Sequence, residues 1–251
     1  MSNSRIFTFG CSFTEWHWPT WADMICYKND GYNFGQKGGG ITQILHKVAN
    51  ANRKYNFTEL DKIIIMLPSL FRHDKVGTNN GETTWVCQGS QYSNPGVPRD
   101  WMLMQSLNDI IFLKEYLEAN ELCYWFTAIH DIFDTTFAEY QNLNQQQLDH
   151  LQYVSEIIKF DYPTMMESLV SIKGQWGSRK QPLYTHRGAP ELHPTILEHY
   201  DYANKIQKVN IRREDILTAH LKMLRLKNVG EMNDWCKENF NIFSTQGYQI
   251  Y

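Results

Sequence analysis

The sequence lacks several features that mark other classes of protein. Its 24 Lys and Arg residues are outnumbered by 27 Asp and Glu residues, and no segment gathers enough basic residues to bind nucleic acid. No apolar run approaches the roughly 20 residues of a membrane span, and no signal peptide precedes the first apolar stretch. These absences predict a cytoplasmic protein without nucleic-acid or membrane partners.

Cysteine is also scarce. The five cysteines stand at positions 11, 26, 87, 123 and 236, and none forms a CxxC pair or a Cys/His cluster with metal-ligand spacing. We therefore expect no metal or other cofactor. Cys26 and Cys123 lie in apolar stretches and are predicted to be buried thiols, which favours a reducing compartment.

The hydrophobic pattern alternates between short buried strands and helices. Strands are predicted at residues 5–9, 31–34, 61–67 and 122–128. Helices are predicted at residues 18–27, 41–51, 101–118, 148–158, 194–208, 214–226 and 231–240. The continuous apolar run DKIIIML is typical of a parallel strand that is covered on both faces. The alternation predicts an α/β fold, a three-layer α/β/α sandwich with a mainly parallel sheet of four or five strands.

The chain is predicted to form a single domain over residues 1–251. Residues 73–100 are polar and rich in turn-forming residues, and we expect a long surface excursion there with a hairpin around 84–87. Residues 209–251 are expected to add helices to the same domain.

Several polar residues follow the predicted strands where ligands usually bind, at the carboxyl edge of a parallel sheet. Ser12 follows the first strand, the glycine run 38–40 follows the second, and Ser69 and Arg72 follow the third, while His193 precedes a late helix. A serine, a glycine-rich backbone, a polar third position and a histidine are the parts of an acyl-transfer site. Each has an ordinary alternative, such as a helix cap for the serine or a surface charge for the arginine.

The segments around these residues resemble the SGNH, or GDSL, hydrolases. FTFGCSFTEW is similar to their first block, with Cys11 in place of the usual aspartate, and NFGQKGGGITQI to their second. ELHPTILEHYDYA is similar to their last block. The resemblance implies that Ser12 is the nucleophile and His193 its base. It also implies that the backbone N–H groups of Ser12 and Gly38 form an oxyanion hole.

The third block, MLPSLFRHD, departs from the family pattern because it has no asparagine. Ser69 is the candidate for the third oxyanion donor in its place. Arg72 is the candidate for binding an anionic group of the substrate, because a guanidinium group binds carboxylates and phosphates well.

The triad acid also departs from the pattern. The position three residues before His193 is Pro190, and the nearest acid is Glu191. Glu191 is therefore the candidate acid, and Asp131 and Asp134, which follow another strand, are held in reserve.

Two classes of function follow from the resemblance. The first is an esterase or deacetylase that acts on a small ester or an acylated carbohydrate, with no cofactor. The GCSFT variant resembles bacteriophage proteins, so the second is an SGNH-fold phage protein of little or no activity that binds further copies of itself or a virion partner. The retained serine, glycine and histidine favour the first class, and the missing asparagine and displaced acid favour the second. A flavodoxin-like nucleotide binder is disfavoured, because GCSFTEWHW offers few glycines and hydroxyls to a phosphate.

Overall fold

The computed structural model describes residues 4–79, 82–90, 97–168, 185–186, 189–190, 193–226 and 229–239. For the strand residues 75–79, 82–90, 185–186 and 189–190 only the backbone is described.

A four-stranded parallel sheet lies at the centre, with strand order β2-β1-β3-β6. Its strands are β1 (Ile6–Gly10), β2 (Gly31–Gly35), β3 (Lys62–Leu67) and β6 (Tyr124–Ala128). In the register, Phe9 of β1 lies opposite Phe34 on one side and Ile65 on the other. Each of these strands begins and ends within two residues of the predicted bounds.

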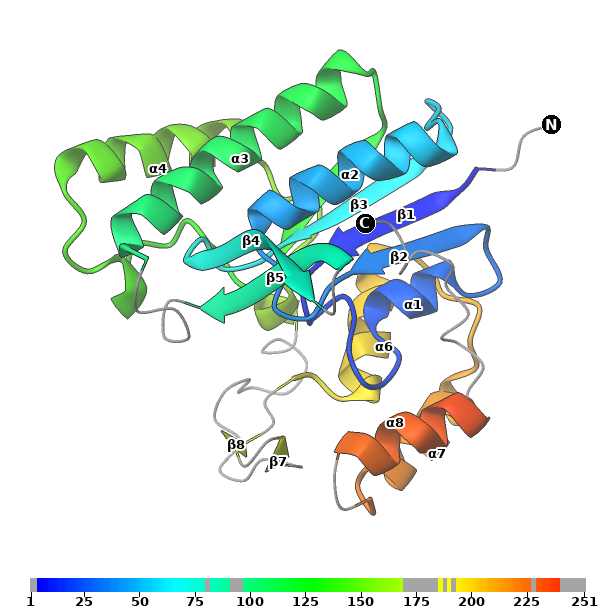
Figure 1. Cartoon of the computed structure of the whole chain (residues 1–251). Helices are drawn as coiled ribbons and strands as arrows, with labels where there is room; N and C mark the ends of the chain where they lie inside the picture. The colour runs from blue at the N-terminus through cyan, green and yellow to red at the C-terminus, as the bar shows by residue number, and fades with distance from the viewer. Residues whose placement is uncertain are drawn as a thin grey trace.

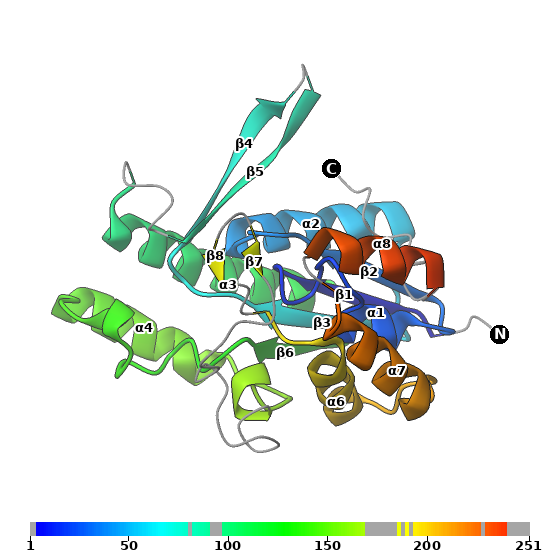
Figure 2. The same ribbon diagram turned by 90° about the horizontal axis from the view of Figure 1, so that it is seen from below.

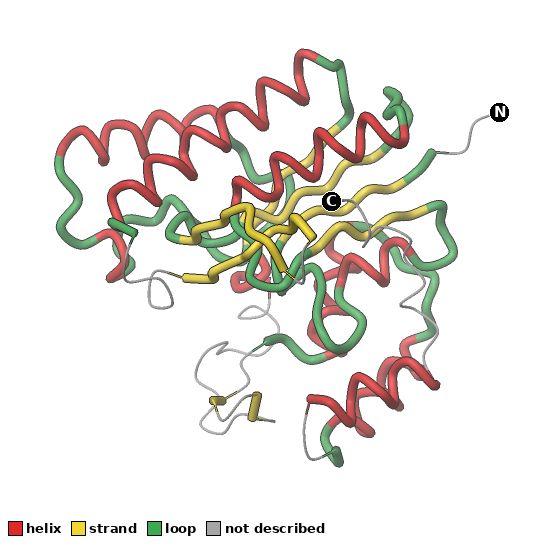
Figure 3. Tube along the Cα trace, viewed as in Figure 1, coloured by secondary structure: helices red, strands yellow, loops and turns green. Residues whose placement is uncertain are grey.

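Helices cover both faces of this sheet (Figures 1 and 3). One face carries α2 (Ile41–Tyr55), α3 (Arg99–Ala119) and α4 (Gln145–Ile157). The other face carries α1 (Trp21–Cys26), α6 (Ile196–Ile206), α7 (Arg213–Met223) and α8 (Val229–Asn239). The predicted three-layer α/β/α sandwich is confirmed.

Successive side chains of each strand feed two separate cores. In β3, Ile63 and Ile65 pack with the helices α2 and α3, while Ile64 and Met66 pack with α1 and α6. Because neighbouring strand residues point to opposite faces, a strand with two covered faces must be apolar throughout. This is the physical reason for the continuous run at residues 63–67, all of which are buried.

A two-stranded antiparallel hairpin extends away from the sheet (Figure 2). Its strands are β4 (Arg72–Asn79) and β5 (Glu82–Ser90). The excursion predicted for 73–100 is therefore largely this hairpin, and the predicted hairpin position was wrong, because residues 84–87 lie inside β5. Asn79 pairs with Glu82, and the intervening sequence is Asn-Gly, a pair typical of tight hairpin turns that the prediction overlooked. A second short pair joins β7 (Thr185–His186) to β8 (Ala189–Pro190).

Two helices begin later than predicted because threonines cap them. Thr20 donates its backbone N–H to Asp23 ahead of α1, and Thr195 donates its own to Glu198 ahead of α6. These reciprocal contacts form capping boxes. Pro194, predicted at the first position of a helix, therefore precedes the cap of α6.

The burial of two cysteines differs between the faces and edges of the sheet. Cys26 is buried as predicted, but Cys123 is exposed, because it lies just before β6 at the amino edge of the sheet. None of the helices in the described part of the chain is long and apolar enough to cross a membrane. No cluster of three or more His, Cys, Asp or Glu side chains suited to a metal ion occurs among the described residues.

Candidate active site

Ser12 lies in a tight loop that directly follows β1. The N–H groups of Thr14 and Glu15 both donate to the carbonyl of Cys11, at 2.9 and 3.0 Å, so the chain turns sharply around the serine. Gly10 permits this turn, because a Cβ atom there would lie 2.1 Å from the hydroxyl of Thr14. The serine is only 6% exposed. Its hydroxyl is thus held at the carboxyl edge of the sheet, as predicted.

A buried polar network connects this loop to neighbouring elements. The carbonyl of Thr14 accepts hydrogen bonds from the Thr20 hydroxyl at 2.5 Å and the Asn33 amide at 2.8 Å. The same Asn33 amide donates to Asp23 at 2.9 Å, and its oxygen accepts the N–H of Gly35 at the same distance. Because buried polar networks with satisfied partners are rigid, the loop that carries Ser12 is fixed to both β2 and α1.

His193 meets Ser12 across the carboxyl edge of the sheet. Its Nε2 atom lies 2.8 Å from the Ser12 Oγ atom, which is a hydrogen bond. Behind the histidine, the indole N–H of Trp18 donates to the carbonyl of Pro194 at 2.9 Å. The capping box of Thr195 then begins α6. The prediction that the serine and histidine lie within hydrogen-bond reach is confirmed.

An aromatic wall holds the imidazole ring. Trp16 stacks on His193 with ring centroids 3.6 Å apart and planes inclined by 17°. Phe13 packs on the same ring at 4.9 Å. This wall restricts rotation of the imidazole and shields it from water. Sequence reasoning did not assign Trp16 to the site, and its place in the aromatic cluster beside Ser12 was the only available signal.

The glycine run at 38–40 follows β2 at the same carboxyl edge of the sheet. The N–H of Gly39 donates to the carbonyl of Gln36 at 2.9 Å, closing a turn in which Gly38 has a φ of +76°. Only glycine adopts this conformation without strain. The glycine run is tied to the loop that carries Ser12, because Gln36 donates its N–H to the Gly10 carbonyl and Lys37 forms an ion pair with Glu15 at 3.4 Å.

The third strand end places Ser69 and Arg72 close to this edge. The Ser69 hydroxyl oxygen accepts the N–H of Phe71 at 3.3 Å, which leaves its O–H free to be aimed elsewhere. Arg72 donates from Nη1 to the carbonyl of Gly39 at 3.0 Å. The structure therefore brings Arg72 to the glycine run, and its predicted role in substrate binding stays a prediction.

The described residues do not include the predicted triad acid. Glu191 lies outside them, so its role stays a prediction. The reserve acids Asp131 and Asp134 accept the backbone N–H groups of Phe133 and Thr136, at 3.0 and 2.9 Å, and so stabilise local turns.

A second histidine lies close to the first. His199 on α6 is fully buried, and within the described part of the chain neither ring nitrogen has a hydrogen-bond partner. Burial, reinforced by nearby His193, lowers the pKa of His199 to about 3. His199 is therefore neutral at physiological pH. Nothing in its sequence context separates it from the other histidines.

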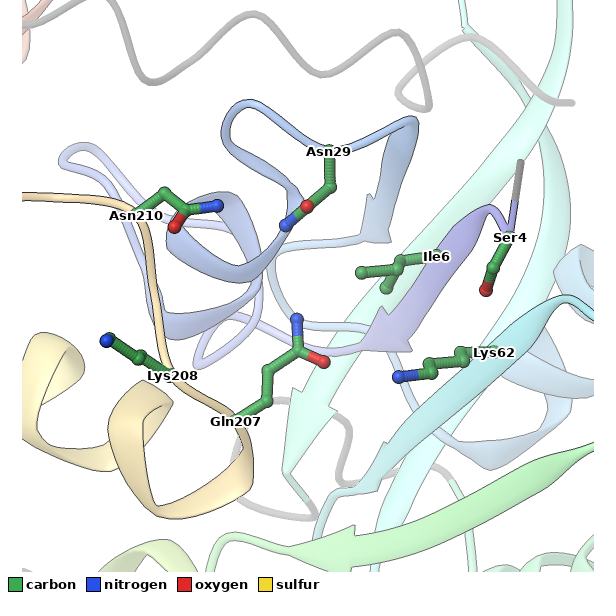
Figure 4. Close-up of a pocket in the computed structure, with 7 residues that line it drawn as sticks. All are labelled: Ser4, Ile6, Asn29, Lys62, Gln207, Lys208 and Asn210. Carbon is green, nitrogen blue, oxygen red and sulfur yellow. The ribbon is translucent and has the colours of Figure 1, made fainter.

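A pocket of about 310 Å³ lies at the opposite edge of the sheet (Figure 4). Ser4, Ile6 and Lys62 line it at the amino ends of β1 and β3, together with Gln207 and Lys208 beyond α6. Since Ser12 follows the carboxyl end of β1, this pocket is separate from the serine–histidine pair.

No family model matches the chain, and no curated protein matches it in sequence. Solved structures similar in fold include a GDSL-like lipase from Bacteroides thetaiotaomicron, at 16% identity and a TM-score of 0.43, covering 86% of this chain and 89% of that one. A GDSL-family lipolytic protein from Veillonella parvula is 15% identical, with a TM-score of 0.46 and coverage of 83% and 99%. A catalytic mutant of an acetylxylan esterase from Geobacillus stearothermophilus is 10% identical, with a TM-score of 0.47 and coverage of 90% and 96%.

Proposed function

We propose that this chain is a serine-dependent ester hydrolase of the SGNH type. The observation that carries the proposal is the 2.8 Å hydrogen bond between Ser12 Oγ and His193 Nε2, at the edge of the sheet where α/β proteins bind ligands. A serine hydroxyl is a weak nucleophile, and a histidine within hydrogen-bond reach activates it by taking its proton.

The reaction would proceed in two halves. The Ser12 Oγ atom attacks the acyl carbon of the ester while His193 Nε2 takes the hydroxyl proton, and the imidazolium then protonates the departing alcohol. Water next attacks the acyl-enzyme with His193 as base, releasing the acid and restoring the serine. The N–H groups of Ser12 and Gly38 and the hydroxyl of Ser69 are the proposed donors to the oxyanion.

The remaining assignments complete this proposal. Glu191 is the proposed partner of the His193 imidazolium. Two roles compete for Arg72: contact with an anionic substrate group, and positioning of the glycine run, to whose Gly39 carbonyl it donates at 3.0 Å. A small ester or an acylated carbohydrate is the proposed substrate. The buried serine and the aromatic wall of Trp16 and Phe13 favour a compact acyl group such as acetyl.

Hydrolysis of p-nitrophenyl acetate and of acetylated sugars tests the proposal. We expect turnover by the wild type, and none above background by Ser12→Ala. Ser106→Ala is the matched control, because Ser106 is another buried serine, on α3, with no place in the proposed mechanism. Equal activity of wild type and Ser12→Ala would contradict the proposal.

The second candidate is an SGNH-fold interaction protein of little or no activity. The hairpin β4–β5 favours it, because a two-stranded ribbon that extends from the body offers unpaired strand edges to another chain. Absence of turnover by the wild type on the whole ester panel would favour this candidate.

A further inference from the structure

Two side chains at the base of the hairpin contact a single peptide group. The guanidinium of Arg72 donates to the carbonyl oxygen of Gly39 at 3.0 Å. The N–H of Gly40 donates to both carboxylate oxygens of Asp74, each at 2.9 Å. This carbonyl and this N–H belong to the same Gly39–Gly40 peptide, so β4 holds the peptide plane at both of its polar atoms.

The fit around this peptide leaves little room for a Cβ atom. A Cβ atom on Gly40 would lie 2.8 Å from an oxygen of Asp74 and 3.1 Å from the Cβ of Arg72. A Cβ atom on Gly39 would lie 2.3 Å from the side-chain oxygen of Gln43, which is fully buried. The glycine run therefore permits close approach of the hairpin base. The absence of side chains serves packing here, as well as backbone flexibility.

Asp74 also caps the N-terminus of α2, although it lies far from that helix in the sequence. Gly40 precedes α2 and has no side chain with which to cap it, and the Asp74 carboxylate accepts the N–H of Gln43 at 3.1 Å as well. Asp74 is only 7% exposed, so its contacts to these backbone groups are shielded from water. A carboxylate at a helix N-terminus is favoured by the helix dipole.

We propose that Arg72 and Asp74 are positioning residues, which hold the Gly39–Gly40 peptide. Through the turn that the Gly39 N–H closes on Gln36, they thereby fix the N–H of Gly38, two peptide groups earlier, as an oxyanion donor. The inference rests on the ester hydrolysis proposed above. It gives Arg72 a role in shaping the site, in place of contact with the substrate. It also explains why a hairpin that extends from the body has two charged residues buried or half-buried at its base.

Steady-state kinetics of variants test the positioning role. An oxyanion donor stabilises the transition state more than bound substrate, so its displacement lowers kcat and leaves KM nearly unchanged. We expect Asp74→Ala to lower kcat about 100-fold, the order of loss for a misplaced oxyanion donor. Arg72→Met should lower kcat about tenfold, and Arg72→Lys should recover most of it because one N–H donor is retained. A substrate-binding arginine would instead raise KM.

The matched control lies at the other edge of the sheet. Arg5 and Asp61 also hold a loop through its backbone, because Arg5 donates to the carbonyl of Tyr55 at 2.9 Å and Asp61 accepts the N–H of Thr58 at 2.7 Å. Asp61→Ala removes a buried aspartate with the same chemistry, far from Ser12. It should leave kcat and KM at their wild-type values at a temperature where the protein stays folded.

Amide hydrogen exchange separates this inference from the proposed function. In Asp74→Ala, exchange over residues 36–43 should be about five to ten times faster than in wild type, as expected for loss of a helix cap. Unchanged exchange would overturn the inference whatever the activity. Faster exchange with unchanged kcat in an active enzyme would overturn it as well. If the wild type hydrolyses no ester, the proposed function fails, and exchange alone then decides whether the two residues hold the loop.

Discussion

An arginine and an aspartate hold a loop at each edge of the central sheet, but the pKa of the aspartate is shifted in opposite directions at the two edges. At the amino edge, Asp61 and Arg5 form an ion pair at 2.6 Å. Burial opposes ionisation of Asp61, but hydrogen bonds from Arg5 and Thr58 outweigh it and lower its pKa. At the carboxyl edge, burial dominates and raises the pKa of Asp74, although the N–H groups of Gln43 and Gly40 oppose the shift.

These opposite shifts give opposite responses to pH. The contribution of Asp61 to stability is present above the ordinary aspartate pKa of about 4 and is lost as the pH falls through its lowered pKa. Asp74 binds its proton more tightly in the folded state, so its contribution declines as the pH rises from about 4 to its raised pKa. The amino edge thus stabilises the fold at neutral pH, while burial at the carboxyl edge disfavours the ionised form of Asp74.

The largest effect should come from Ser12→Ala at the carboxyl edge. Without Oγ no acyl-enzyme forms, and kcat should fall at least about 10⁴-fold, towards the residual catalysis of the oxyanion donors. Stability should change by less than about 1 kcal/mol, since one hydrogen bond is lost. Kinetics and urea denaturation measure the two quantities. If Ser12→Ala loses activity only because it unfolds, the carboxyl edge would affect stability, as the amino edge does, and would have no separate catalytic role.

The next effect should come from Asp61→Ala at the amino edge. Removing the buried carboxylate of this partly exposed ion pair should lower the free energy of unfolding by about 2 kcal/mol, the order expected for lost hydrogen bonds to a charged group. Asp74→Ala should lower it by about 1 kcal/mol, the value of a helix cap. Denaturation of both variants at pH 7 gives the ranking, and a larger loss for Asp74→Ala would reverse our assignment of the stabilising edge.

His199 should make the stability of the fold depend on pH. Its pKa of about 3 lies below that of an unfolded histidine, about 6.5, so the unfolded chain binds one more proton between these values. Stability contributed by the neutral ring is present above pH 6.5 and is lost as the pH falls, by at most about 1.4 kcal/mol per pH unit. His199→Phe should reduce this slope. Identical slopes in wild type and variant between pH 6 and 4.5 would show that His199 does not titrate as described.

Trp16→Leu should have a smaller effect on catalysis. Loss of the stacked indole frees rotation of the His193 ring, and we expect kcat to fall about tenfold, since misorientation of a catalytic group weakens proton transfer. Trp235→Leu on α8 is the control, because that indole packs in the core formed by α6, α7 and α8. Equal kinetic effects of the two substitutions would indicate general loosening of the fold.

The smallest effect is expected from Glu191→Gln. Its spacing departs from the family's Asp-x-x-His pattern, and we predict a loss of less than about tenfold in kcat. A triad acid would cost about 10⁴-fold. A large loss with unchanged folding would identify Glu191 as the essential partner of His193.

Much of the fold follows from local patterns in the sequence. The run at 63–67 is apolar because both sheet faces are covered, and this property can be read without a structure. The helix starts at Thr20 and Thr195 were readable too, since each threonine is followed three residues later by an acid. The sequence comparison with known hydrolase motifs located Ser12 and His193.

Contacts between distant segments could not be predicted in the same way. Trp16 stacks on a ring 177 positions away in sequence, and Asp74 caps a helix that begins more than 30 residues earlier. No periodicity or spacing specifies such pairs, because they arise only when the strands are brought side by side.

The most direct test of the account is covalent labelling of Ser12 by a fluorophosphonate, measured by intact mass and peptide mapping. The account predicts one adduct, on Ser12, that is absent in Ser12→Ala and forms at least about 100-fold more slowly in His193→Ala, because the serine loses its base. No adduct on the wild type, or a rate unaffected by His193→Ala, would contradict the claim that these two residues form an activated nucleophile.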